Sequence, residues 1–132
     1  GDQWRPFIHV GDAAGAYVLA LEKTRSKMKG IFNLGADELN HQLKEIAKFV
    51  KSSIPDVMVE QSNNTDRRNY RVSFAKIKKT LGFRAEKSVT DGIEEIKNAI
   101  VSGKIRSWEN PIYYNNRFPL TGKNKTSKYY WK

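Results

Sequence analysis

Apolar positions along the first hundred residues follow two spacings, which predict short strands and longer helices. Apolar runs at residues 7–10 and 30–35 are typical of buried strands, and alternation at residues 57–60 indicates another short strand. Helical spacing predicts helices over residues 13–23, 40–53 and 74–81, and a last helix opened by Ser88 and ended by Gly103. We therefore expect an α/β fold in which helices cover a small sheet.

The residue types at the ends of these helices support their boundaries. Asp12, Ser73 and Ser88 are candidate N-caps, because their side-chain oxygens can accept backbone N–H groups. Gly82 and Gly103 are candidate terminators, since glycine adopts the left-handed conformation at low cost. The polar stretch at residues 61–69, between the predicted helices, is expected to be a loop.

The Gly11/Gly15 spacing and His41 have a structural interpretation. We interpret the Gly11/Gly15 spacing as a helix-packing feature, because no Gly-x-x-x-x-Gly-Lys or Gly-x-Gly-x-x-Gly loop accompanies it. His41 opens the predicted helix at residues 40–53 and is expected to be a surface or capping residue.

The charge of the chain is positive and unevenly distributed. The formal net charge is +10, with 24 basic and 14 acidic residues. Residues 1–102 carry 17 basic and 13 acidic side chains, whereas residues 103–132 carry 7 and 1. We divide the chain into a mildly basic lobe at residues 1–103 and a basic aromatic extension at residues 104–132, to which any polyanion binding would belong.

The composition excludes several kinds of site. The chain contains no cysteine, so disulfides and thiolate metal sites are excluded and the cytoplasm is the expected compartment. The histidines His9 and His41 have no metal-binding spacing, and we expect no metal. No apolar run is long enough for a membrane span. Because the chain starts without methionine, directly on a motif, we expect a fragment of a longer protein.

Arg5 lies just before the first apolar run, separated from it by Pro6, and a helix start follows within a few residues. A fixed cation beside a strand and a helix N-terminus can hold an anion in a defined place. The alternative is that Arg5 is a surface arginine beside a core strand.

Three segments, in chain order, resemble the C-terminal half of extended short-chain dehydrogenases/reductases, the NAD(P)-dependent epimerases and dehydratases that act on nucleotide-sugars. They are Arg-Pro-Phe-Ile-His-Val-x-Asp-Ala-Ala at residues 5–14, Asp-Arg-Arg-Asn-Tyr-Arg-Val-Ser-Phe-Ala-Lys-Ile at residues 66–77 with Leu-Gly-Phe at 81–83, and Val-Thr-Asp-Gly-Ile at residues 89–93. The sequence departs from that pattern at Ser73, where aspartate is usual, and at Gly11, where a charged residue is common.

The resemblance implies a substrate-binding role for particular residues. In that family an arginine of the first segment and an arginine of the second grip the diphosphate of the substrate, which implies Arg5 together with Arg67 or Arg68. Asn33 lies where the family has an asparagine near the substrate, although a strand-end asparagine bonded to a turn is an equal alternative. Gln3 resembles a glutamine of the dehydratases, and its role is open.

The parts of the family that perform chemistry are missing from this chain. The resemblance implies NAD or NADP in the full-length enzyme, held by an N-terminal Rossmann domain, and a Tyr-x-x-x-Lys pair for proton transfer. The chain has neither the glycine-rich fingerprint nor a tyrosine with lysine four residues on. We therefore expect it to contain no catalytic residue, to bind no cofactor and to be inactive alone, with the Rossmann domain and a nucleotide-sugar as partners and a homodimer as one form of the full-length enzyme.

Two other functions compete with this substrate-binding lobe. The extension interleaves basic and aromatic residues, which could stack on single-stranded nucleic acid and make the chain a non-enzymatic binding module. These residues are Trp108, Tyr113, Tyr114, Arg117, Phe118, Lys123, Lys125, Lys128, Tyr129, Tyr130, Trp131 and Lys132. We expect instead that the extension packs on protein and has a frayed basic end, without nucleic acid. The third reading is a degenerate homologue that keeps the lobe for protein contacts alone.

Overall fold

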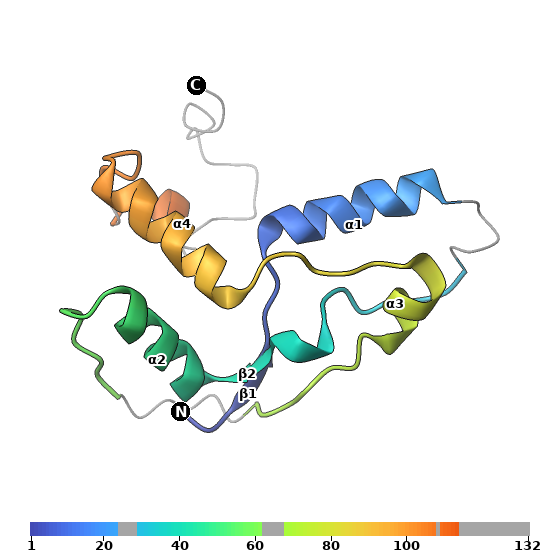
Figure 1. The fold of residues 1–132 in the computed structure, drawn as a ribbon, viewed down its shortest axis with the longest axis horizontal. Helices are drawn as coiled ribbons and strands as arrows, with labels where there is room; N and C mark the ends of the chain where they lie inside the picture. The colour runs from blue at the N-terminus through green and yellow to red at the C-terminus, as the bar shows by residue number, and fades with distance from the viewer. Residues whose placement is uncertain (24–28, 62–67, 108, 114–132) are drawn as a thin grey trace, which may run out of the picture. The chain divides into compact units, whose positions relative to one another are not determined.

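The computed structural model describes residues 1–23, 29–61, 68–107 and 109–113. In chain order its elements are β1 (Trp4–Pro6), α1 (Val10–Glu22), the 3-10 turn η1 (Asp37–Leu39), β2 (Asn40–Gln42), α2 (Leu43–Ser53), α3 (Ala75–Leu81), α4 (Val89–Val101) and the 3-10 turn η2 (Pro111–Tyr113) (Figure 1). The chain forms two compact units, Gly1–Asn98 and Ala99–Lys132. The described part is thus a small α/β fold with a two-stranded sheet, in agreement with the predicted class.

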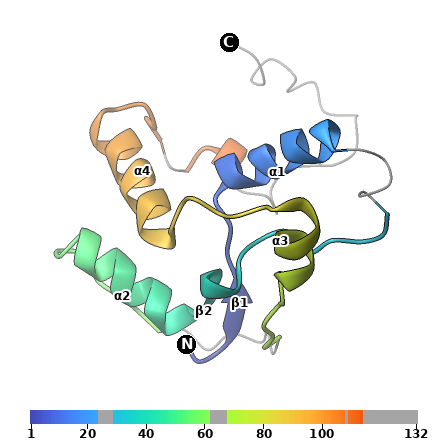
Figure 2. The same ribbon diagram turned by 45° about the vertical axis from the view of Figure 1, so that its right-hand side comes forward.

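The sheet consists of β1 and β2, which pair antiparallel and lie side by side in both views (Figures 1 and 2). Arg5 stands opposite His41 in this ladder. Bonds beyond the strands extend the pairing, from Phe7 N–H to the Leu39 carbonyl (2.9 Å) and from Lys44 N–H to the Gly1 carbonyl (2.9 Å). The strand predicted at residues 7–10 is therefore wrong in position, because β2 and the residues that flank it run beside residues 1–7.

The other two predicted strands are also wrong. Residues 30–35 and 57–60 have no strand partner among the described residues, and side chains satisfy part of their backbone instead. Lys76 Nζ donates to the Ile31 carbonyl (2.6 Å), and Lys51 Nζ donates to the Val57 carbonyl (2.7 Å). An apolar spacing alone does not supply the neighbouring strand that a ladder requires.

Helix α1 begins earlier than predicted and uses a different cap. His9 is its N-cap, and its Nδ1 accepts the Gly11 N–H (3.1 Å). Asp12, the predicted cap, lies in the first turn, and its carboxylate accepts the backbone N–H groups of Glu86 and Lys87 at 3.2 and 3.0 Å. The N-cap prediction for Asp12 is therefore wrong, because this carboxylate holds the segment between α3 and α4.

His9 also connects the start of α1 with α4. Because its Nδ1 is an acceptor, the neutral ring carries its proton on Nε2, which lies 2.9 Å from the Glu95 carboxylate. Lys87 reaches the other oxygen of Glu95 at 3.3 Å. The hydrogen bonds from His9 and Lys87 lower the pKa of Glu95 below its ordinary value.

Helix α2 begins at Leu43, because residues 40–42 are taken up by β2. A capping box of Gln42 and Glu45 starts it, with Gln42 N–H donating to Glu45 Oε2 at 2.7 Å. His41 is neither a cap nor a surface residue as predicted. Its half-buried ring packs edge-on against Phe49, with 5.4 Å between ring centroids.

The ends of α3 and α4 largely follow the predictions. Gly82 ends α3 in the left-handed conformation (φ 74°), and its N–H donates to the Lys78 carbonyl at 3.1 Å. Gly103 (φ 72°) follows the end of α4. The Ser88 hydroxyl accepts the Asp91 N–H (3.1 Å) at the start of α4, and the Ser88 hydrogen bonds lower the pKa of Asp91. The predicted cap of α3 is displaced by one residue: Phe74 is the N-cap, although the hydroxyl of Ser73 accepts the Ala75 N–H at 3.4 Å.

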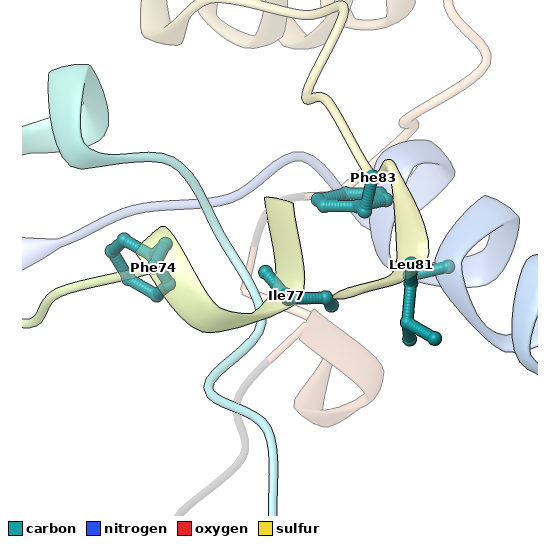
Figure 3. Packing of buried hydrophobic residues seen from close by; sticks show 5 residues of the cluster. Phe74, Ile77, Leu81 and Phe83 are labelled. Atoms are coloured by element: carbon teal, nitrogen blue, oxygen red, sulfur yellow. The ribbon is translucent and has the colours of Figure 1, made fainter. Parts of the chain in front are cut away.

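The core lies between α3 and α1 (Figure 3). Its buried members are Ala16, Phe74, Ile77, Leu81 and Phe83, with the partly buried Ile8, Leu19, Phe32, Leu34 and Val72 packed around them. The small Ala16 is the position at which α1 approaches this cluster. Gly15 has no heavy atom within 4 Å of a Cβ placed on it, so the predicted Gly11/Gly15 packing feature is wrong at Gly15.

Some predictions fall on residues outside the described part, among them Arg67 and most of the basic aromatic extension, from which Tyr113 is described in η2. The described residues of the predicted 61–69 loop, Gln61, Arg68 and Asn69, lie in no helix or strand.

None of the described helices combines the length and apolar composition needed to cross a bilayer.

Two glycines should respond to alanine in opposite directions. A Cβ on Gly35 (φ 155°) would lie 2.6 Å from the Phe74 ring, whereas Gly15 in α1 has open space. Gly35→Ala should lower the free energy of unfolding by about 1–3 kcal/mol through overpacking. Gly15→Ala, the matched control, should raise it by about 0.5–1 kcal/mol. Urea unfolding measures both, and an unchanged stability of Gly35→Ala would contradict the packing of Phe74 on this turn.

Candidate anion-binding site

The candidate site is built around Trp4 in β1. Trp4 stands opposite Gln42 in the ladder, and its own backbone groups bond elsewhere: its N–H donates to Asn69 Oδ1 (2.9 Å), and its carbonyl accepts the Tyr70 N–H (3.4 Å). Alternate residues of a strand direct their backbone groups to opposite edges, so these bonds occupy the edge of β1 opposite β2. The segment that follows the predicted arginine loop is thereby tied to the strand that carries Arg5.

Arg5 is held by this same segment. Its Nη1 donates to the Trp4 carbonyl at 2.8 Å, and its Cζ lies 5.3 Å from the centroid of the Tyr70 ring. The side chain is half-buried. The guanidinium of Arg5 is thus held against an aromatic ring, and a guanidinium is the side-chain group that forms bidentate bonds with phosphate oxygens.

A second arginine is stacked in the same way. The Cζ of Arg71 lies 4.5 Å from the centroid of the Trp4 ring. Sequence reasoning missed Arg71, Trp4 and Tyr70. The available signal was the repeated aromatic-arginine pair, Trp4-Arg5 and Tyr70-Arg71, but the spacing along the chain does not show that each arginine stacks on the aromatic residue of the other pair.

Asn40 fixes the segment at its other end. Its Oδ1 accepts the Val72 N–H (2.9 Å), and its Nδ2 donates to the Val72 carbonyl and the Asp37 carbonyl, both at 3.0 Å. The next bond follows directly, from Phe74 N–H to Asp37 Oδ1 at 2.8 Å. Asn40 is buried, so one side chain replaces a strand partner for Val72 and continues the segment into α3.

The predicted site residues fall into two groups. Gln3, Arg5 and the segment that begins at Arg68 meet around β1; the Gln3 carbonyl accepts the Leu43 N–H at 3.1 Å, and Arg68 is exposed next to Asn69. Asn33 belongs to a different place, since its Nδ2 donates to the Ser73 carbonyl at 3.3 Å. This bond joins Asn33 to the chain just before α3.

A small hollow lies elsewhere, against the core. Its volume is about 120 Å³, and it is lined by Gly35, Ala36, Asp37, Glu38, Phe74, Lys78, Phe83, Arg84 and Ala85. Sites that enclose nucleotide-sized ligands have volumes of roughly 300–1,000 Å³. This hollow is therefore too small for a nucleotide. Among the described residues no group of histidine and acidic side chains is placed to hold a metal ion.

Comparison with known families bears on the first part of the chain. The model of the NAD dependent epimerase/dehydratase family matches residues 1–35. The match contains β1, α1, Arg5 and Asn33, but stops before the segment of Arg68. It indicates an NAD-dependent epimerase/dehydratase relationship at the level of the family and for this segment.

Removing the Asn40 side chain should cost more than removing an exposed amide. Asn40→Ala leaves the half-buried backbone groups of Val72 without this partner, and each lost bond is worth about 1 kcal/mol. We expect the free energy of unfolding to fall by about 2–3 kcal/mol in guanidinium titrations. The control is Asn69→Ala, where one exposed bond to Trp4 is lost and the change should be below about 1 kcal/mol. Equal losses would contradict the role of Asn40.

Proposed function

We propose that this chain is the substrate-binding lobe of an NAD(P)-dependent epimerase or dehydratase that acts on nucleotide-diphosphosugars. The observation that carries the proposal is the position of Arg5. It lies in the segment that the family model matches, and its guanidinium lies over the ring of Tyr70, a residue two positions after Arg68 in the sequence. In this proposal Arg5 and Arg68 or Arg67 hold the diphosphate, and Gln3 and Asn33 are secondary contacts. The cytoplasm is the proposed compartment.

A diphosphate clamp accounts for a lobe without catalytic groups. Arginine binds phosphate oxygens through two parallel charge-assisted hydrogen bonds, which fix orientation as well as position. Binding energy from the diphosphate then places the sugar ring relative to reactive groups supplied elsewhere. Arginines held against aromatic rings suit this task, because less rotational freedom is lost when the substrate binds.

The residues of this chain do not fit a nicotinamide dinucleotide. The sequence has no Gly-x-Gly-x-x-Gly loop and no Tyr-x-x-x-Lys pair, and the hollow beside Phe74 is too small. Cofactor binding and proton transfer are therefore assigned to a Rossmann domain, the proposed partner of the lobe.

An exposed apolar stripe on α1 supports the need for such a partner. Val10, Tyr17 and Leu21 are 78%, 71% and 86% exposed, and they recur at helical spacing on one face. The stripe extends for about 16 Å along the helix. Large apolar side chains in a row along a helix are typical of surfaces that another protein element covers. The Rossmann domain is the occupant we propose.

Loss of either arginine should weaken binding of nucleoside diphosphates. A hydrogen bond to a charged group is worth about 1.5–3 kcal/mol, so Arg5→Ala and Arg68→Ala should each weaken the affinity for UDP or GDP roughly ten- to a hundredfold in calorimetry. Arg84→Ala, beside the small hollow, is the matched control and should bind as the parent chain does. Unchanged affinity in both test variants would reassign these arginines to surface roles.

A charged residue placed in the apolar stripe should lower stability only in a protein that also contains the proposed Rossmann domain. Leu21→Asp should leave the thermal unfolding of the present chain unchanged within about 0.5 kcal/mol, because the side chain is exposed. In a protein that also contains the Rossmann domain it should destabilise the domain contact by about 1–3 kcal/mol. Met58→Asp, at an equally exposed position (85%) outside the stripe, is the control. Identical behaviour of the two variants in the longer protein would contradict the proposed docking.

A further inference from the structure

We propose that Tyr70 is a positioning residue for Arg5: its ring supports the guanidinium in the orientation in which it receives the anion, while its backbone N–H bonds the same Trp4 carbonyl as Arg5. The inference rests on the proposed function, because it concerns the same diphosphate site, and it adds a residue that neither the sequence resemblance nor the family match assigns. Tyr70 lies outside the matched residues 1–35.

One backbone carbonyl beside Arg5 accepts two donors. The Trp4 carbonyl accepts Arg5 Nη1 at 2.8 Å and the Tyr70 N–H at 3.4 Å. The Tyr70 backbone and the Arg5 side chain therefore meet at one atom. With the Cζ of Arg5 5.3 Å from the ring centroid, Tyr70 supports the guanidinium by its face while Trp4 holds one of its nitrogens. Two contacts in different directions restrict the side chain more than either contact alone.

Three contacts restrict Trp4, so its carbonyl holds a defined position for the bond from Arg5. Its N–H donates to Asn69 Oδ1, its carbonyl accepts the Tyr70 N–H, and Arg71 lies over its ring at 4.5 Å. All three contacts come from consecutive residues of one segment. The residues that follow Arg68 therefore also orient Arg5, so a shift of this segment would move both proposed arginines of the clamp together.

The exposure of Tyr70 argues against a role in core packing. Its side chain is 45% exposed, and it is not a member of the buried cluster around Phe74. The backbone bond to Trp4 persists in any variant, since it involves the Tyr70 N–H. What a substitution removes is the ring face under Arg5, and the hydroxyl is not needed for that contact.

The experiment compares Tyr70→Leu with Tyr70→Phe in the present chain, with Tyr17→Leu on α1 as the control for loss of an exposed tyrosine. Calorimetry uses inorganic pyrophosphate and UDP as probes. Loss of an exposed cation–π contact corresponds to about a two- to fivefold change, so Tyr70→Leu should bind both probes that much more weakly. Tyr70→Phe and Tyr17→Leu should bind as the parent chain does. Equal affinities for the Leu and Phe variants of Tyr70 would overturn the proposal.

A double-mutant cycle separates positioning from a general structural effect. In an Arg5→Ala background Tyr70→Leu should cause no further loss, because the group it orients is gone. A loss of the same size in both backgrounds would overturn the inference while the clamp stands. If Arg5→Ala binds pyrophosphate and UDP like the parent chain, the proposed function fails first, and the role of Tyr70 fails with it.

The orientation of Arg5 can also be read without a ligand. The order parameter of the Arg5 Nε–H, from ¹⁵N relaxation in the free chain, should fall in Tyr70→Leu and be retained in Tyr70→Phe, while backbone order at Asn69 stays unchanged in both. This measurement decides the proposal even if a variant binds too weakly for calorimetry. An Arg5 side chain that is equally ordered in all three proteins would contradict it.

Discussion

The placement of the whole candidate site depends on the buried amide of Asn40. Its side chain satisfies both backbone groups of Val72 and bonds the turn at Asp37, which brings the chain after residue 68 beside the sheet. A third strand would have achieved the same by continuous pairing. Here a single amide mimics one residue of a strand, and the segment beyond it is free to contact β1 through side chains as well as backbone. The stacked arginines are a consequence of that arrangement.

The described core contains few buried residues, so the apolar side chains that α1 leaves exposed are a large part of its apolar surface. The buried cluster involves one small residue of α1 and the aromatic and aliphatic side chains of α3 and its end. Another face of α1 exposes the large apolar side chains of Val10, Tyr17 and Leu21. A helix with this distribution stabilises contacts on two sides. The lobe provides one side, and the proposed Rossmann domain provides the other.

Polar contacts compensate for the limited apolar burial at the junction of α1 and α4. His9 uses both ring nitrogens, one for the first turn of α1 and one for Glu95, while Asp12 holds the backbone that leads into α4. Most of these groups are partly exposed, so each bond contributes modestly. Their value is geometric, because together they determine where the last helix starts.

The sequence by itself determined the α/β class, the existence of the helices, and the terminators Gly82 and Gly103, since these depend on local periodicity and on backbone conformations that glycine adopts at low cost. Through family resemblance it also predicted a role for Arg5 and for Arg67 or Arg68, without separating the last two. Only the tertiary structure decided which residues pair as strands, which side chain caps α1, and which aromatic ring supports each arginine. Those outcomes depend on partners far away in the chain: Trp4 meets Asn69 across 65 residues, and no local spacing encodes that meeting. A strand requires a neighbouring strand, and the orientation of each arginine here depends on an aromatic ring from a distant part of the chain. Both contacts form only when the chain folds.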